Sequence, residues 1–163
     1  MNVLNVTSPD INNGNGCRVT VWVAGCTHKC PKCHNKWTWL YTQGTPLSSD
    51  KIRNAVFNEL EKPYIEGITF SGGDPLDQSL VSINELYLFI NEIHERFPDK
   101  TVWVYTGYTL EELKAFDKSC INNVLSSIDY LVDGPYIDEL RDLSLPFRGS
   151  KNQRIINMRN GES

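Results

Sequence analysis

The feature that most restricts the fold is a regular alternation of strand-like and helix-like segments along the chain. Residues 18–24 (RVTVWVA) alternate Val19, Val21 and Val23 with other β-branched or aromatic side chains, a pattern typical of a buried strand. Similar short segments lie at residues 67–71, 101–106 and 128–132, and residues 154–156 are expected to add a last short strand. Strands that alternate with helices favour parallel pairing through right-handed crossovers.

Three helices are expected between these strands. The first begins after Ser48-Ser49-Asp50 and ends before Pro63. In the third, Thr109 and Glu112 have the spacing of a capping box, and this short helix is expected to run to about Lys118. The second is long and amphipathic and ends before Pro98, with an apolar stripe formed by Ile83, Leu86, Ile90, Ile93 and Phe97.

The strand count predicts an α/β fold with an open sheet. A closed eight-stranded barrel usually needs ~250 residues, and this chain has 163. We therefore expect one domain over residues 1–163, an open partial (β/α) barrel of about four to six parallel strands. Each strand runs into a loop of Gly, Pro, Cys or Asp, and in βα barrels such loops build the active site.

Composition excludes several classes of protein. A net charge of -4 argues against a nucleic-acid-binding groove, which would need a clustered basic face. No run of eighteen apolar residues and no signal-peptide pattern appears, so we expect a cytoplasmic protein without a membrane partner. Five cysteines, an odd and clustered number, favour metal or redox chemistry in a reducing compartment over a disulfide framework.

Three of these cysteines, Cys26, Cys30 and Cys33, lie in the loop GCTHKCPKCHN at residues 25–35. One interpretation is a structural zinc site of the Cys3His type, completed by His28 or His34. The other is a 4Fe-4S cluster with three protein ligands, in which the fourth iron stays open to a substrate or cofactor. Structural zinc sites usually take their ligands from two separated pairs, whereas these cysteines share one short segment that follows a strand.

The C-x3-C-x2-C spacing of this loop resembles that of the radical S-adenosylmethionine enzymes. Further segments resemble the activating proteins of anaerobic ribonucleoside-triphosphate reductase, which are glycyl-radical activases. These segments run in order over most of the chain: NGNGCR at 13–18, GCTHKCPKCHNK at 25–36, SGGDP at 71–75, VWVYTGY at 102–108, VDG at 132–134 and RGSKNQ at 148–153.

The resemblance implies both the fold subtype and the chemistry. The partial barrel would be of the radical SAM type, and Cys26, Cys30 and Cys33 would ligate a 4Fe-4S cluster. S-adenosylmethionine would chelate the open iron and, on reduction, break into methionine and a 5'-deoxyadenosyl radical. The cofactors carry this chemistry, so no catalytic residue is expected beyond the cluster and S-adenosylmethionine.

The turn SGGDP would meet the methionine amino group of S-adenosylmethionine through backbone oxygens of Gly72, Gly73 and Asp74. Glycine lets a main chain approach a ligand closely, although an ordinary strand-to-helix turn explains the same residues. The family commonly has Glu where this chain has Asp74. It also often has an aromatic residue before the third cysteine, where this chain has Lys32, so adenine contacts would come from the backbone around Lys32 and Cys33 or from His34.

Other residues carry weaker expectations. His28 and His34 are expected to face solvent as loop residues, and Cys17 and Cys120 to pack as small hydrophobes. Asp133 follows a strand and would touch the ribose hydroxyls, or else form a structural ion pair. Two further residues, Arg148 and Asn152, would reach the carboxylate of S-adenosylmethionine or make similar structural contacts.

The resemblance also implies the partners. The radical would abstract hydrogen from a backbone glycine in the large catalytic subunit of anaerobic ribonucleotide reductase, and reduced flavodoxin or ferredoxin would supply the electron. Alternatives are an activator of another glycyl-radical enzyme, a radical enzyme for a small molecule, and a zinc-binding module without catalysis. Trp37 and Trp39 would either pack in the core or, since they follow the cysteine loop together with Tyr41, shield the cluster from water or meet a partner.

Overall fold

Seven strands form one open sheet in the order β3-β1-β2-β4-β5-β6-β7 in the computed structural model, which describes residues 1–160. The strands are β1 Asn2–Asp10, β2 Arg18–Val23, β3 Thr45–Pro46, β4 Gly67–Gly72, β5 Thr101–Tyr105, β6 Tyr130–Asp133 and β7 Arg154–Asn157. The four central strands, β2, β4, β5 and β6, are parallel. The outer strands β1, β3 and β7 are antiparallel to their neighbours.

The sheet is open, as expected, but strand β1 and the two-residue strand β3 were not predicted. Strand β1 pairs with β2 through a register that shifts twice, and most of its residues are only partly buried. The residues of β1 therefore show neither the clean alternation of a half-buried strand nor the continuous apolar run of a central one. The predicted last strand exists as β7.

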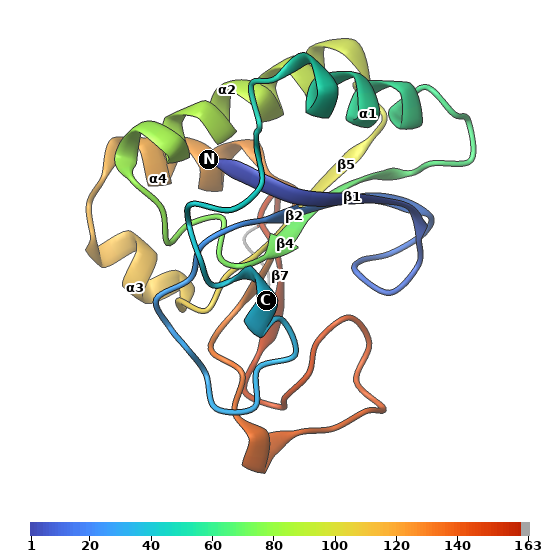
Figure 1. Cartoon of the computed structure of the whole chain (residues 1–163). Helices are drawn as coiled ribbons and strands as arrows, with labels where there is room; N and C mark the ends of the chain where they lie inside the picture. Colours follow the sequence, from blue (N-terminus) through green and yellow to red (C-terminus); the bar gives the residue numbers. More distant parts are fainter. Residues whose placement is uncertain (161–163) are drawn as a thin grey trace.

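Four α-helices accompany the sheet, and Figure 1 shows α1, α2 and α4 gathered on one side of it. The helices are α1 Asp50–Leu60, α2 Leu80–Arg96, α3 Leu110–Ala115 and α4 Ser119–Ser127, with short 3-10 helices η1 Lys36–Thr38 and η2 Asp138–Leu140. Ser49 caps α1, and the predicted capping box of Thr109 and Glu112 is present on α3. Helix α4 was not predicted because its N-cap, Lys118, gives no side-chain capping signal.

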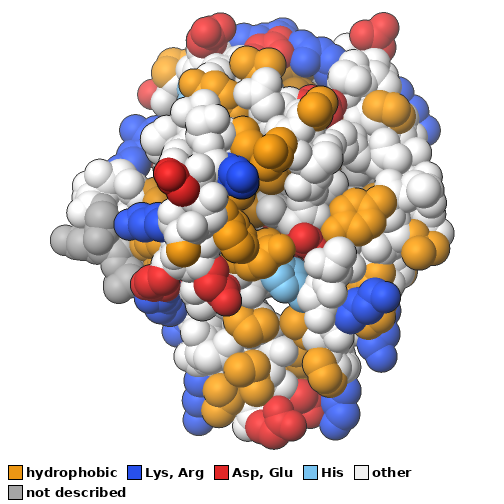
Figure 2. All heavy atoms as spheres, turned by 90° about the vertical axis from the view of Figure 1, so that its left-hand side faces the viewer, with side chains coloured by type: hydrophobic (Ala, Val, Ile, Leu, Met, Phe, Trp, Pro, Cys, Tyr) orange, Lys and Arg blue, Asp and Glu red, His pale blue; other side chains and the backbone are white. Residues whose placement is uncertain are grey.

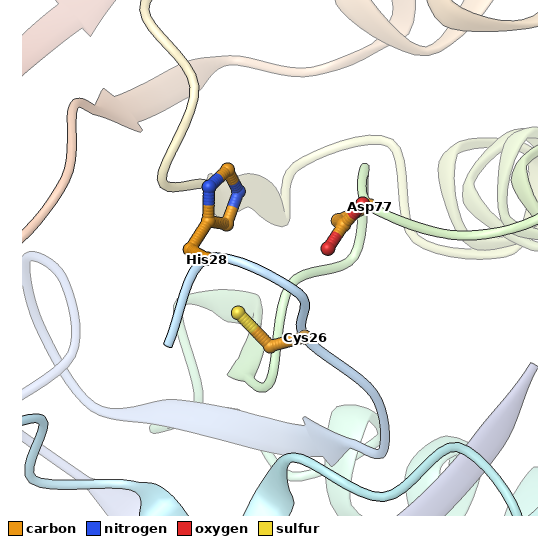
Figure 3. Close-up of side chains that lie close together, drawn as sticks. All are labelled: Cys26, His28 and Asp77. Atoms are coloured by element: carbon orange, nitrogen blue, oxygen red, sulfur yellow. The ribbon is translucent and has the colours of Figure 1, made fainter. Parts of the chain in front are cut away.

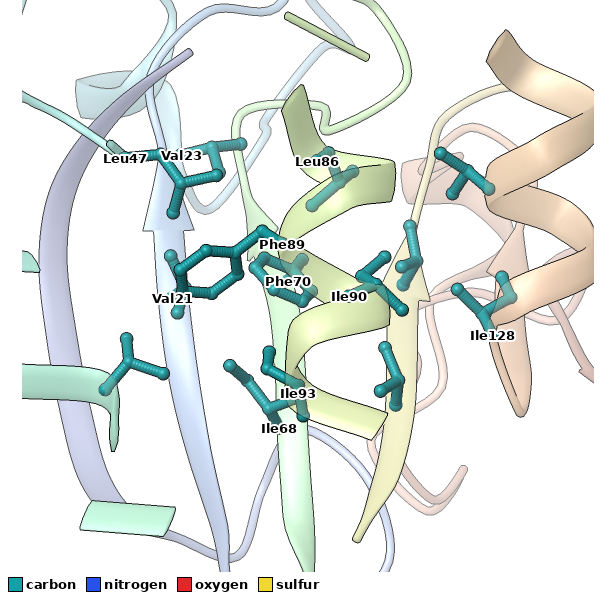
Figure 4. Close-up of a cluster of buried hydrophobic side chains, with 14 of the residues drawn as sticks. Val21, Val23, Leu47, Ile68, Phe70, Leu86, Phe89, Ile90, Ile93 and Ile128 are labelled. Carbon is teal, nitrogen blue, oxygen red and sulfur yellow. The ribbon is translucent and has the colours of Figure 1, made fainter. Parts of the chain in front are cut away.

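The core lies between α2 and the parallel strands (Figure 4). Ile90 and Ile93 of α2 are fully buried against β4, and the ring of Phe89 meets Phe70 edge-on with centroids 6.2 Å apart. Each such side chain contributes roughly 1.5–3 kcal/mol when it leaves water. This packing fixes the strands whose ends carry the candidate site. Among residues 1–160, no helix is both long and apolar enough to span a bilayer.

Candidate functional site

The loops that follow β2, β4, β5 and β6 meet at one edge of the sheet because the four strands are parallel. The loop after β2 carries the three cysteines. The end of β4 and the loop after it carry the SGGDP segment at residues 71–75, which we call the glycine turn. In Figure 1 the loops after β2 and β6 descend below the sheet, and an ion pair between Lys32 and Asp138 joins them. The predicted site residues therefore lie at or just after the ends of β2, β4 and β6, at one edge of the sheet.

The cysteine loop turns sharply twice. Lys29 and Lys32 have left-handed backbone conformations, with φ of 47° and 59°, and such conformations are uncommon for non-glycine residues. The Cys33 amide donates to the Cys30 carbonyl oxygen at 3.1 Å, so the last two cysteines share one tight turn. All three cysteines are free and partly buried. Burial, reinforced by the charge of Asp74, raises the pKa of the Cys26 thiol to about 12.

The positions of the thiols test the two metal interpretations. A single zinc ion bound by thiolates has Zn-S bonds of about 2.3 Å, so no two sulfurs can be more than about 4.6 Å apart. Among the described residues, Cys26, Cys30 and Cys33 do not gather within 4.8 Å of one another. Wider spacing suits a cluster in which each thiolate holds a different iron. The donor set therefore fits a 4Fe-4S cluster better than one zinc ion.

One other group of donor atoms does lie within 4.8 Å, namely Cys26, His28 and Asp77 (Figure 3). Two of its three members already have hydrogen-bond partners. His28 Nε2 lies 2.7 Å from Asp74 Oδ2, and Asp77 Oδ2 accepts from the Thr27 amide at 2.6 Å. These contacts hold the cysteine loop against the β4–α2 loop.

The glycine turn packs directly against the start of the cysteine loop. Gly72 has a φ of +101°, a conformation that side chains disfavour. The Gly73 amide donates to the Val23 carbonyl oxygen at 2.9 Å, and the Asp74 amide donates to the Gly25 carbonyl oxygen at 2.8 Å. The turn thus continues the pairing of β2 with β4 into the site, and its glycines are required by close backbone contact.

Asp74 is almost fully buried, at 1% exposure, and both of its carboxylate oxygens are engaged. Its Oδ1 accepts from the Leu76 amide at 2.9 Å. Its Oδ2 accepts from Thr106 Oγ1 at 3.0 Å and from the Gly107 amide at 2.8 Å, and it also pairs with His28. The side chain therefore joins the ends of β2, β4 and β5, and the Asp74 carbonyl oxygen in turn accepts from Gln78 Nε2 at 3.0 Å.

His28 does not face solvent, and that prediction was wrong. Its side chain is only 17% exposed because it pairs with Asp74 and meets the Tyr108 ring edge-on, with centroids 4.4 Å apart. The hydrogen bond to Asp74 raises the pKa of His28, against the opposing effect of burial. His34 is exposed, as predicted, and its ring lies 5.2 Å from the Tyr136 ring.

A cavity of about 530 Å³ opens beside the third cysteine. Its volume lies within the range of roughly 300–1,000 Å³ that small-ligand sites usually have. The residues that line it include Cys33, His34, Ser71, Phe147 and Arg148. Arg148 Nε and Asn152 Oδ1 are both buried, and neither has a hydrogen-bond partner among residues 1–160. Arg148 thus brings an unsatisfied donor to a cavity beside the cysteines.

Asp133 and Lys32 are engaged elsewhere. The Asp133 carboxylate is fully buried, pairs with Arg154 at 2.5 Å and accepts from the Leu110 amide at 2.8 Å. This arrangement is the structural ion pair that was the alternative to a ribose contact. Lys32 is exposed and pairs with Asp138 at 3.0 Å.

Sequence analysis missed Asp77 and Tyr108 as site residues. Besides Thr27, Asp77 accepts from the Tyr41 hydroxyl at 3.1 Å and from the Tyr108 hydroxyl at 3.0 Å. Asp77 lies only three residues after Asp74, on the same loop. A second aspartate in that loop could have indicated a second contact to the neighbouring loops. The partners of Asp77, however, are 31 to 50 residues away in the sequence.

An open α/β sheet with three cysteines on one strand-end loop, beside a glycine turn and a cavity, defines a single-cluster iron-sulfur protein. Residues 12–156 match the family model described as a 4Fe-4S single cluster domain. The chain belongs to the family of anaerobic ribonucleoside-triphosphate reductase-activating proteins.

Three curated proteins with that name illustrate the similarity. The protein of Haemophilus influenzae is 40% identical over 157 residues, which cover 95% of this chain and 97% of the relative. That of Escherichia coli K12 is 39% identical over 92% of this chain and 94% of its own length. That of Enterobacteria phage T4 is 36% identical over 95% of this chain and 93% of its own length.

Proposed function

We propose that this protein activates an anaerobic ribonucleoside-triphosphate reductase by generating a glycyl radical on it through reductive cleavage of S-adenosylmethionine. The observation that carries the proposal is the cysteine loop packed against the Gly72-Gly73-Asp74 turn at the ends of adjacent parallel strands. Relatives that match over more than nine-tenths of the chain bear the name of such activators. The open sheet is consistent with a partial barrel of the radical SAM type.

Cys26, Cys30 and Cys33 would hold a 4Fe-4S cluster. When bound, such a cluster with one open iron supplies an electron to S-adenosylmethionine, whose cleavage yields methionine and a 5'-deoxyadenosyl radical. Two features of the chain suit this role: the thiols are too widely spaced for one zinc ion, and they lie together on a single loop. The zinc-binding module is therefore the weaker hypothesis.

The remaining contacts to S-adenosylmethionine would come from this chain's own loops. The Gly73 carbonyl oxygen accepts no hydrogen bond from the described residues, so it is available to the methionine amino group. Arg148 Nε, which is buried beside the cavity without a partner, would bind the methionine carboxylate. His34 and the backbone around Lys32 and Cys33 would contact the adenine.

A protein loop would have to reach the cavity for the radical to act on a glycine. Figure 2 shows hydrophobic side chains gathered in the lower part of the molecule, where the loops after β2 and β6 lie. Leu143 is 83% exposed and Leu140 is 38% exposed on the loop after β6. Exposed apolar side chains of this kind suit the docking of a partner protein. We assign that partner as the large reductase subunit, with reduced flavodoxin or ferredoxin as the electron donor.

Electron paramagnetic resonance on a mixture tests the proposal. The anaerobically reconstituted protein is reduced, supplied with S-adenosylmethionine and mixed with its cognate reductase, and a glycyl-radical signal is expected. Omitting the reductase should abolish the signal while slow cleavage of S-adenosylmethionine continues. Cleavage without a signal on the reductase, but with a signal on another glycyl-radical enzyme, would support the alternative activator.

A further inference from the structure

The two residues that follow Cys26 are each held by a carboxylate from the loop between β4 and α2. Asp77 Oδ2 accepts from both the amide and the hydroxyl of Thr27, each at 2.6 Å. Asp74 Oδ2 lies 2.7 Å from His28 Nε2. The first cysteine is thereby attached to the loop that contains the glycine turn, although the two loops are about 50 residues apart in the sequence.

The pairing of His28 with Asp74 is the more buried of these two attachments. The Asp74 side chain is 2% exposed and the His28 side chain is 17% exposed. Hydrogen bonds to a charged group in such surroundings are short and about twice as strong as neutral ones. Asp74 also accepts from the Leu76 and Gly107 amides. These hydrogen bonds fix the position of the carboxylate that the His28 imidazole contacts.

Packing on its other sides fixes the His28 ring as well. A Cβ atom added to Gly107 would lie 2.7 Å from His28 Cδ2, so the ring fills the space that a side chain would take. The Tyr108 ring covers it edge-on at 4.4 Å, and the Tyr108 hydroxyl donates to Asp77 Oδ1 at 3.0 Å. His28 thus has one orientation, set by the loops after β4 and β5.

We propose that His28 is a positioning residue whose pairing with Asp74 holds the cysteine loop and the glycine turn at one fixed separation. Binding sites need their parts held to within roughly 0.5 Å, and here one part belongs to the cysteine loop and the other to the turn. The identity of the ligands in this proposal rests on the proposed function. The coupling between the two loops does not, because only residues of the chain form it.

Hydrogen exchange measured by mass spectrometry on the full-length, anaerobically purified protein tests the coupling. His28→Leu removes the donor, whereas His28→Gln keeps an amide donor at a similar reach. His94→Leu is the matched control, because His94 also makes one 2.7 Å hydrogen bond, to the Ser127 carbonyl oxygen, and lies outside the site.

In His28→Leu, the peptides that contain the Leu76 and Gly107 amides should exchange about tenfold faster, because both amides donate to Asp74. His28→Gln should restore most of the protection, and His94→Leu should leave these peptides at the wild-type rate. Unchanged exchange in His28→Leu, or equal exchange in the Leu and Gln variants at matched thermal stability, would overturn the proposal.

Titration with S-adenosylmethionine after reconstitution gives a second measurement. His28→Leu should retain the wild-type iron content, because all three cysteines remain, while its Kd for S-adenosylmethionine rises by about tenfold. Loss of iron with unchanged affinity per cluster would contradict the positioning role. If the wild-type protein bound no S-adenosylmethionine, the proposed function would fail, and the exchange experiment would still decide whether His28 couples the loops.

Discussion

Gly73 lies so close to Gly25 that a Cβ atom on Gly73 would fall 2.4 Å from the Gly25 carbonyl oxygen. The two glycines belong to the loops after β4 and β2, and the Asp74 amide donates to that same carbonyl oxygen. Backbone groups on both sides cannot swing away as a flexible side chain would. The close approach of the two loops therefore depends on the absence of a side chain at residue 73.

Gly73→Ala is expected to lower the free energy of unfolding by about 1–3 kcal/mol, because one added methyl group overpacks a rigid contact. Chemical denaturation measures this change. Gly149→Ala is the control and should cost less, since the nearest atoms to its Cβ would belong to a side chain, the Tyr136 ring at 3.1 Å. Equal midpoints for wild type and Gly73→Ala would show that the two loops separate without cost.

The five cysteines should divide into two groups by their effect on the cluster. Cys26→Ala, Cys30→Ala and Cys33→Ala should each abolish assembly of the iron-sulfur centre, because a thiolate ligand is lost. Cys17 and Cys120 pack against the hydrophobic core, so their replacement by Ala should leave iron and sulfide content unchanged. Iron and sulfide assays after anaerobic reconstitution make the comparison.

Two results would contradict this division. Loss of the cluster in Cys17→Ala would mean that the ligand set is wrong. A colourless wild-type protein with one divalent ion per chain would favour the zinc hypothesis, despite the wide spacing of the thiols.

The central strands and three of the helices were predictable because their signals are local. The alternation of Val19, Val21 and Val23 predicts β2. Ser49 and Thr109 predict the starts of α1 and α3, and both residues cap these helices in the structure. Strand β1 and helix α4 lacked such signals. The register of β1 with β2 shifts twice and its residues are unevenly buried, and no side chain caps the start of α4.

The site was predictable in outline but not in its contacts. Parallel strands bring their following loops together, so the cysteines and the glycine turn could be placed at one edge from sequence alone. The pairing of His28 with Asp74 joins residues 46 positions apart, and no local pattern specifies it. A histidine in a loop is expected to face solvent unless its partners are known. His28 is partly buried because Gly107 and Tyr108, which are distant in the sequence, pack against its ring.

The pairing of Glu92 with Arg53 on the helical surface should give a small acid-dependent term in stability. The hydrogen bond from Arg53, at 2.5 Å, lowers the pKa of Glu92 below its usual value. A lowered pKa stabilises the folded state above the unfolded pKa of about 4.3. That stability is lost as the pH falls through the lower, folded value.

Denaturation of wild type and Glu92→Gln between pH 7 and about pH 3 measures this term. The difference in unfolding free energy should be below about 1 kcal/mol at neutral pH, since the two side chains are still 32% and 31% exposed to solvent, and should shrink in acid. A difference that grows as the pH falls would mean that Glu92 has a raised pKa.

Arg18 should be among the most costly residues to replace, because this charged residue is only 1% exposed. It donates to the Ile68 and Thr101 carbonyl oxygens, each at 2.8 Å, and to the Thr69 hydroxyl at 2.9 Å. It also lies over the Trp103 ring at 5.5 Å, and burial lowers its pKa to about 10. Arg18→Met would remove these hydrogen bonds from buried oxygens and is expected to lower the free energy of unfolding by about 3 kcal/mol. Arg53→Met removes a pair that is about one-third exposed, so it should cost less than about 1 kcal/mol. Equal losses in the two variants would show that the buried acceptors of Arg18 find other donors.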